Sequence, residues 1–176
     1  MLVRASGWSH IMIRLSTQQM AEFAARGFLR LEAVVPDTIN QQFLGDIGEV
    51  SPAPDSVMGH YGNIMRSSVV PLVNPGTPLN EAYPASSALH RLLAVDEVAG
   101  AIASLVGEDC VVDHHFLHIT FPPAYWQQEK IPQTAQAYHQ DSTIDPRSAF
   151  DVQLFYFPHD VTPAMGGTRF LPGSQF

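Results

Sequence analysis

The hydrophobic period of this chain changes near Gly107, and that change constrains the fold more than any other feature. Before it, apolar residues recur at helical spacing in three stretches, 16–27, 36–50 and 86–107. After it, residues 110–121 alternate as in a strand, with the odd-numbered side chains on one face and the even-numbered ones on the other. Helices followed by strands predict an α+β fold, with the helices packed on one side of a β core.

Local signals predict where the helices begin and end. Ser16 and Gln19 match a capping box, and Gly27 suits a left-handed exit from the first helix. Pro36 stands near the start of the second helix, and within 86–107 Asp96 is a plausible second cap before a stop at Gly107. The letters "FLRL" at 28–31 predict a strand between the first two helices.

The remaining stretches predict one domain in two parts. Six prolines and no sustained period in residues 51–84 predict a long irregular segment, in which "HYGNIMRSS" at 60–68 could line a pocket. This segment belongs to an N-terminal helical region, 1–109. Residues 110–176 then supply strands at 110–121, 137–141, 151–157 and 168–171.

Composition narrows the class of partner. The net charge is −8, with one lysine and eight arginines, which argues against binding to nucleic acid or to an anionic membrane. The opening 15 residues fit neither a signal peptide nor a membrane span. Cys110 is the single cysteine, so no intrachain disulfide can form, and we expect a cytoplasmic protein that acts on a small molecule.

One pair of residues has the chemistry of a metal site. His139 and Asp141 are two positions apart in "AYHQDST", so on a strand both side chains point to one face. Two histidines and one carboxylate hold Fe(II) in non-heme oxygenases, and this pair would supply two of the three ligands. The pair is a weak signal alone, because a strand histidine and a turn aspartate also occur without a metal.

The surrounding sequence adds context. The stretch from "HITFPP" through "AYHQD" to "GGTRFLPGS", with the opening "LSTQQMAEFAARGFLRLEAVVP", resembles the phytanoyl-CoA hydroxylase-like family of Fe(II)/2-oxoglutarate-dependent dioxygenases. The resemblance implies a double-stranded β-helix, which is a jelly-roll or cupin-like core, with the N-terminal helices packed on one sheet. It also implies decarboxylation of 2-oxoglutarate to succinate, coupled to hydroxylation of a small organic substrate by O2.

The resemblance also implies roles for individual residues. His139 and Asp141 match the first two iron ligands, and Asp141 blocks the position that halogenating relatives leave open for a halide. His115, Phe155 and Thr168 match positions near 2-oxoglutarate, although ordinary strand packing accounts for His115 and Thr168, and core packing accounts for Phe155. His118 would face away from this side.

Two expected features of that family are not visible in these 176 residues. They are a third ligand histidine on a late strand and an arginine that pairs with 2-oxoglutarate. His159 should lie at the barrel rim, Arg147 and Arg169 come too early in strand order, and Gln175 stands where the family often has histidine. Four strands are about half of a jelly roll, so we expect a further segment or a second chain to complete the barrel, and the 176 residues alone to be inactive.

Two other functions are compatible with the sequence. A degenerate or partner-completed jelly roll could bind a small ligand without turnover, and a cupin-like isomerase or epimerase is more distant. A late histidine and arginine would favour the hydroxylase. The substrate itself is not encoded in any motif, although the scarcity of lysine and arginine favours a neutral or amino-acid-like molecule over a CoA thioester.

Overall fold

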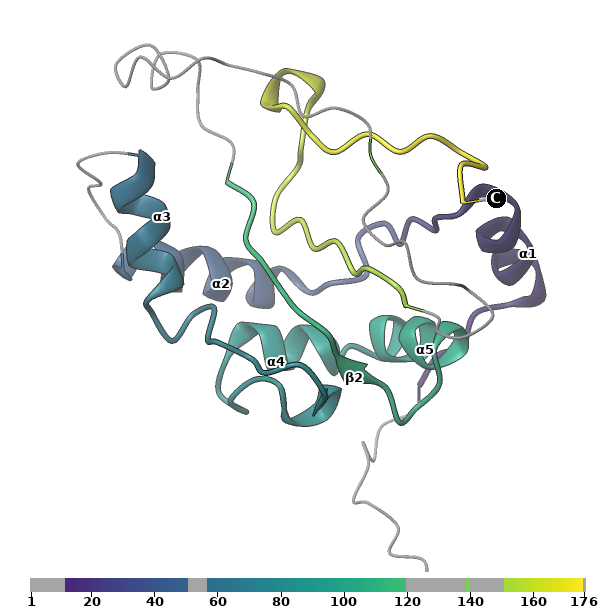
Figure 1. The fold of residues 1–176 in the computed structure, drawn as a ribbon, viewed down its shortest axis with the longest axis horizontal. Helices are drawn as coiled ribbons and strands as arrows, with labels where there is room; N and C mark the ends of the chain where they lie inside the picture. The colour runs from purple at the N-terminus through teal and green to yellow at the C-terminus, as the bar shows by residue number, and fades with distance from the viewer. Residues whose placement is uncertain (1–11, 51–56, 120–138, 140–150, 176) are drawn as a thin grey trace, which may run out of the picture.

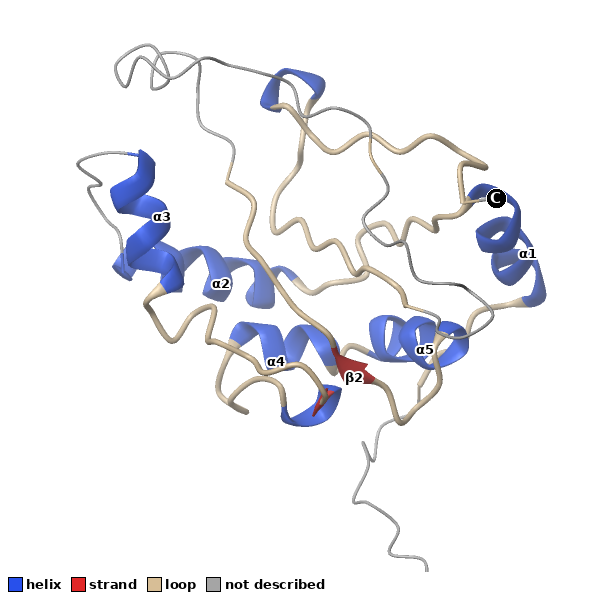
Figure 2. Cartoon of the chain, viewed as in Figure 1, coloured by secondary structure: helices blue, strands red, loops and turns tan. Residues whose placement is uncertain are grey.

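The computed structural model describes residues 12–50, 57–119, 139 and 151–175 (Figure 1). Within these residues the protein is mainly helical, with one small antiparallel sheet and long extended or looping connections (Figure 2). The regular elements in chain order are α1 (Thr17–Arg26), α2 (Asp37–Val50), α3 (Val57–Met65), β1 (Thr77–Pro78), the 3-10 helix η1 (Leu79–Glu81), α4 (Ala88–Leu93), α5 (Asp96–Leu105), β2 (Val111–Val112) and the 3-10 helix η2 (Pro163–Met165).

The capping signals of α1 are confirmed. The backbone N–H of Gln19 donates to the Ser16 hydroxyl at 3.2 Å, and the backbone N–H of Ser16 donates to the Gln19 side chain at 2.9 Å. Gly27 ends the helix at φ 79°, a conformation that costs glycine little, and its N–H donates to the carbonyl of Phe23. The helix therefore begins and ends where its own sequence directs.

The main core lies between α2, α3, α4 and α5. Ile39 and Phe43 of α2 face Leu92 of α4, because apolar residues four apart share one side of a helix. Ile64 of α3 is 0% exposed, which makes it the most completely buried large side chain among the described residues. Val70, Ala88 and Val98 complete the buried cluster.

The N-terminal residues that precede α1 lie along α5. The N–H of Ile13 donates to the carbonyl of Asp96 at 3.1 Å, and the N–H of Leu15 donates to the Ser104 hydroxyl at 3.0 Å. The backbone approaches α5 so closely at Gly100 that a β-carbon there would lie 2.0 Å from the carbonyl oxygen of Ile13. Only glycine fits at this position of α5 without displacing the N-terminal segment.

The C-terminal residues 170–175 lie against the end of α1, as Figure 1 shows at the label C. The N–H of Gly173 donates to the carbonyl of Arg26, and the Gln175 amide donates to the carbonyl of Ala24, both at 3.0 Å. These two bonds satisfy carbonyls that the last turn of a helix leaves without partners. Phe170 stacks on Phe28 with ring centroids 5.5 Å apart, so apolar contact accompanies the polar cap.

The small sheet pairs β1, which precedes α4, with β2, which follows α5. β1 and β2 pair antiparallel, with Thr77 opposite Val112 and Pro78 opposite Val111. Flanking backbone bonds run from the N–H of Gly76 to the carbonyl of Val112 and from the N–H of Leu79 to the carbonyl of Cys110. A smaller buried cluster of Val73, Ala82 and Val112, with Leu79 and Tyr83 packed against it, lies beside this ladder.

Two predictions for the helical region are wrong. Residues 28–31 contain no strand. Residues 51–84 are not wholly irregular, since α3, β1 and η1 lie in them. The prediction of Asp96 as a cap is off by one residue: Val95 is the N-cap, and Asp96 and Glu97 lie in the first turn of α5, where carboxylates favour the positive end of the helix dipole.

The predicted strands are mostly absent as hydrogen-bonded strands. Within the described residues 110–119, only Val111–Val112 pairs, and 151–157 and 168–171 carry no strand. In the predicted strand 137–141 the structure describes only His139, which is irregular. A strand exists only where a second segment supplies backbone partners, and an alternating pattern does not provide that partner. The described residues thus show helices and a little sheet, and they contain too few paired strands to display a barrel.

Candidate functional site

Only one residue of the proposed metal pair is among the residues that the structure describes. His139 is exposed, whereas Asp141 lies outside the residues that the structure describes. In the ranges 12–50, 57–119 and 151–175 together with His139, no three His, Cys, Asp or Glu side chains gather closely enough to hold a metal. Asp141 is not among these residues, so the assignment of His139 and Asp141 as metal ligands stays a prediction.

His159 and Arg169 are of the right residue type for the missing third ligand and the missing arginine, and both lie on the surface. His159 is exposed, and its Nδ1 lies 2.9 Å from the backbone oxygen of Asp160. Arg169 is also exposed, in the irregular segment that leads to Phe170. Arg147 lies outside the described residues.

Residues 113–119 form an extended segment that crosses the helical layer. His115, Leu117 and Ile119 are half-buried, while His114, Phe116 and His118 are exposed. This is the alternation that the sequence predicts. Leu117 and Ile119 pack against the main core, so the odd-numbered face is the one that meets the helices.

The alternation does not extend back through β2. Val112 is 8% exposed, whereas Val111 is 56% exposed and Asp113 is also on the surface. The inward-facing side chains therefore change from the even-numbered position Val112 to odd-numbered positions from His115 onward. The prediction that Val111 and Asp113 share the face of His115 is wrong, because the segment leaves its ladder after Val112 and no partner strand holds it in phase.

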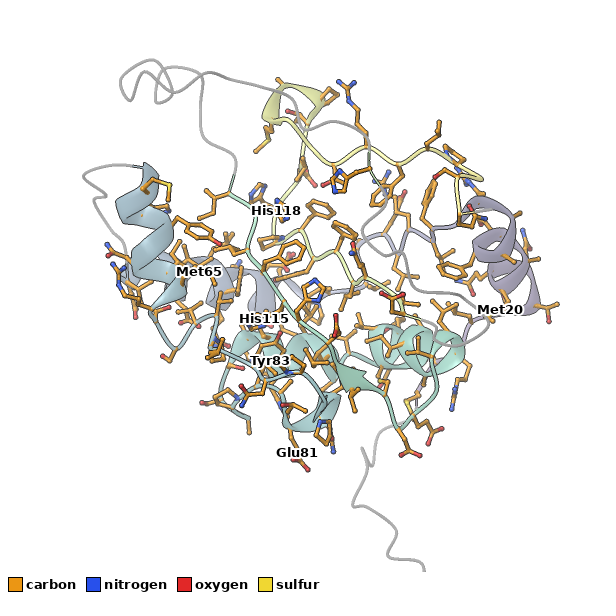
Figure 3. All side chains as sticks on the ribbon, in the orientation of Figure 1. Met20, Met65, Glu81, Tyr83, His115 and His118 are labelled. Carbon is orange, nitrogen blue, oxygen red and sulfur yellow. The ribbon has the colours of Figure 1, made fainter. Side chains whose placement is uncertain are left out.

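His115 meets a residue that the sequence analysis did not single out. Its Nδ1 lies 2.8 Å from the Tyr83 hydroxyl, and the two rings stack with centroids 5.7 Å apart at an interplanar angle of 17°. Figure 3 shows the two side chains side by side, with His118 farther along the same segment. Burial raises the pKa of Tyr83.

The pKa of His115 shifts in the opposite direction. Burial lowers the pKa of the imidazole, the charge of His114 lowers it further, and a hydrogen bond with the backbone of Pro71 partly offsets both. The neutral form of His115 is therefore favoured near neutral pH.

The even-numbered face of the same segment is a short row of exposed rings. His114 stacks on Phe116 at 5.4 Å, and His118 contacts Phe116 edge-on at 4.9 Å. Nδ1 of His114 also lies 2.6 Å from a carboxylate oxygen of Asp113. His118 thus lies on the opposite face from His115.

Tyr156 is the second important residue that the sequence analysis missed. Its hydroxyl donates to Oδ1 of Asn40 at 2.7 Å, and its ring meets Phe43 edge-on at 5.5 Å. Burial raises the pKa of Tyr156 to about 12. The alternation of residues 151–157 places Tyr156 on the face opposite Phe155 and Phe157, and it is the Tyr156 face that is turned inward.

Phe155 and Thr168 do not join His115. Phe155 is 38% exposed and meets Phe170 edge-on at 5.2 Å, while Thr168 is exposed. Within the described part of the chain, no hydrogen bond or ring contact connects either residue with His115. Their proposed place beside 2-oxoglutarate therefore remains an expectation from the resemblance.

A cavity of about 340 Å³ opens between α2 and α4. Ser68 lines it, which is the last residue of the stretch 60–68 that was expected to line a pocket. In the wall of this cavity, the side-chain amide of Gln42 donates to the carbonyl of Ser86 at 3.1 Å. The lining is Gln42, Phe43, Asp46, Glu49, Val50, Ser68, Val69, Pro84, Ser86, Ser87 and Ala88.

Cys110 is a free, half-buried thiol. Burial raises its pKa, the charge of Asp109 acts in the same direction, and a backbone hydrogen bond acts against both. A thiol whose pKa is raised is a poor nucleophile and metal ligand, because the thiolate is the reactive form.

Among the described residues, no helix has the length and apolar character needed to cross a membrane. Comparisons of this chain with models of known protein families, with curated proteins and with solved structures gave no match.

Proposed function

We propose that this protein is an Fe(II)- and 2-oxoglutarate-dependent dioxygenase that hydroxylates a small organic substrate in the cytoplasm. The observation that carries the proposal is the spacing of His139 and Asp141, followed by "GGTRFLPGS". A histidine and a carboxylate two residues apart supply one nitrogen and one oxygen donor, which suits ferrous iron with open positions for O2 and a co-substrate.

The donor chemistry of the two residues fits this metal. His139 would supply a nitrogen donor, and Asp141 would add the negative charge that a divalent cation favours. When bound, iron and 2-oxoglutarate supply the oxidising chemistry. The chain would supply the ligands, orient the substrate and limit the access of water.

The fold around residues 115–119 and the charge of the chain also bear on the proposal. Residues 115–119 alternate between a face that packs on the helices and an exposed face, as a strand covered by helices on one side would. The helix-packed face carries His115, whereas the resemblance places His115 on the inner side, toward 2-oxoglutarate. The net charge of −8 supports a substrate without several phosphates.

Metal titration tests the assignment of the two ligands. We expect the full-length gene product to bind Mn(II), a redox-stable substitute for Fe(II), as followed by the loss of the free-ion signal in electron paramagnetic resonance. His139→Ala and Asp141→Ala should each weaken binding at least about tenfold, since even loss of an outer-shell partner has an effect of this size.

Matched variants control for nonspecific effects. His114→Ala and Asp151→Ala each remove the same type of side chain from an exposed position, and both should bind Mn(II) as the unmodified protein does. Unchanged binding in Asp141→Ala would rule out the proposed site. Binding of Mn(II) and 2-oxoglutarate without turnover would instead select the non-catalytic module.

A further inference from the structure

The cavity between α2 and α4 has the size of a small-molecule site. Figure 1 shows the two helices beside each other. One wall is the face of α2 that carries Phe43, Asp46 and Val50, which are three or four residues apart and therefore share one side of the helix. The other wall comes from residues 68–69 and 84–88. Its volume of about 340 Å³ lies near the lower end of the range for ligand pockets, which begins at about 300 Å³, so it suits a small ligand.

The cavity borders the main core, which gives it apolar walls. Phe43 and Ala88 line it and are buried members of the core cluster. Val50 and Val69 also line it and pack against that cluster. A ligand with an apolar body would remove this surface from water, which contributes favourably to binding. The walls therefore favour a ligand that is partly hydrocarbon.

The charge of the cavity has one sign. Asp46, which is half-buried, and Glu49, which is exposed, lie about one turn apart on α2, and both line the cavity. Neither carboxylate forms an ion pair with a described residue. The described lining residues include no lysine, arginine or histidine. Electrostatic complementarity therefore selects a ligand with a positive charge.

The hydrogen-bonding groups of the walls suit an ammonium group better than a metal ion. The side-chain NH2 of Gln42 donates to the carbonyl of Ser86, so its amide oxygen is left as an acceptor. An ammonium group has three N–H donors and no acceptor, which matches carboxylate and amide oxygens. A divalent metal fits less well, because no three His, Cys, Asp or Glu side chains gather closely enough in the described part of the chain to hold one.

We propose that this cavity binds a small organic ammonium compound. Its apolar body packs against Phe43 and Val69, and its charged group pairs with Asp46 and, closer to solvent, with Glu49. None of the described lining residues is assigned to iron or to 2-oxoglutarate. The inference therefore goes beyond the proposed dioxygenase and does not depend on it.

A pair of probes of equal size tests the role of the charge. Benzylamine is a cation at neutral pH, whereas benzyl alcohol has the same ring and no charge. We expect the full-length gene product to bind benzylamine about tenfold more tightly, since hydrogen bonds to charged groups contribute an effect of this size. Equal affinity for the two probes, or no binding of benzylamine, would overturn the proposal.

Nuclear magnetic resonance titration measures the affinity and locates the probe without any activity measurement. We expect benzylamine to shift the backbone amide signals of residues 86–88 and the side-chain amide signal of Gln42, because these groups line the cavity. Shifts confined to other parts of the chain would overturn the proposal. This comparison uses only the unmodified protein, so it decides the question even if a variant fails to fold.

Variants of α2 then test the two carboxylates. Asp46→Asn keeps the shape but removes the charge, so we expect benzylamine to bind about tenfold more weakly. Glu49→Gln should weaken binding about two- to fivefold, because Glu49 is exposed. Asp37→Asn changes the net charge equally in the first turn of α2, does not line the cavity and should leave binding unchanged. Equal affinity of Asp46→Asn and Asp37→Asn for benzylamine would overturn the proposal.

Discussion

At the scale of single residues, His115 links the stability of the protein to pH. Its pKa in the folded chain lies below the ordinary value of 6.5, so between the two values the unfolded chain binds more protons. The contribution of His115 to the free energy of unfolding is therefore fully present above about pH 6.5 and is lost as pH falls through the lowered pKa.

Urea unfolding at a series of pH values measures this effect. We expect the free energy of unfolding to fall between pH 7 and pH 5, and to fall less steeply in His115→Gln, which cannot be protonated. His114→Gln serves as the control because its side chain is exposed. Equal slopes for the unmodified protein and His115→Gln would show that His115 does not carry the pH dependence.

Tyr156 makes a second residue-scale prediction. Tyr156→Phe keeps the ring against Phe43 but removes the hydroxyl that donates to Asn40, so we expect a loss of about 1 kcal/mol in the free energy of unfolding. Phe157→Ala changes the neighbouring side chain, which is 50% exposed, and should cost no more than about 0.5 kcal/mol. Chemical unfolding of both variants checks this, and a larger loss for Phe157→Ala would mean that the inward residue of 155–157 is misassigned.

At the scale of the elements, the contact between α5 and the N-terminal segment can be tested with two glycines. Gly100→Ala should destabilise the protein by about 2 kcal/mol, because the new β-carbon would lie 2.0 Å from the carbonyl oxygen of Ile13 and force the segment away. Gly48→Ala in α2 meets nothing within 4 Å and should stabilise by about 0.5 to 1 kcal/mol, since alanine favours a helix. Equal stabilisation by both substitutions, measured by chemical unfolding, would place Ile13 away from α5.

The register of the small sheet gives a second element-scale test. Val112 is 8% exposed and packs with Val73 and Ala82, so Val112→Ala, which removes two methylene equivalents, should cost about 1.5 kcal/mol. Val111 is 56% exposed, and Val111→Ala should change the free energy of unfolding by less than about 0.5 kcal/mol. The reverse order in thermal or chemical unfolding would mean that the pairing of β1 with β2 is shifted by one residue.

At the scale of the whole molecule, the sequence predicts the helices well where their signals are local. The capping box of Ser16 and Gln19, the left-handed Gly27 and the four-residue spacing of Ile39 and Phe43 all act through bonds and faces within one helix. Helix α3 was missed because its sequence, VMGHYGNIM, contains two glycines, a histidine and an asparagine and has weak intrinsic helical preference. Its burial at Ile64 shows that tertiary packing stabilises it.

Strands could not be predicted with the same success, because their stability depends on partners distant in the sequence. The alternation correctly predicted that His115, Leu117 and Ile119 share one face, but it did not predict that this face packs on the helices. It did not predict the change of phase after Val112 or the lack of pairing in 113–119, since neither depends on the segment alone.

The candidate site was predictable only as a set of residue types. His139 and Asp141 have the spacing and chemistry of metal ligands, and that information is contained in the sequence. The contacts of His115 with Tyr83 and of Tyr156 with Asn40 join residues 32 and 116 positions apart, so no local pattern could reveal them.

Conversion of 2-oxoglutarate to succinate tests the proposed function most directly. The measurement uses the full-length gene product with Fe(II), ascorbate and O2, and compares it with Asp141→Ala and with the control Asp151→Ala. We predict Fe(II)-dependent succinate formation that Asp141→Ala reduces at least about tenfold and Asp151→Ala leaves unchanged. Succinate formation at the same rate in Asp141→Ala, or none in the unmodified protein, would contradict the assignment of this chain as a 2-oxoglutarate-dependent dioxygenase.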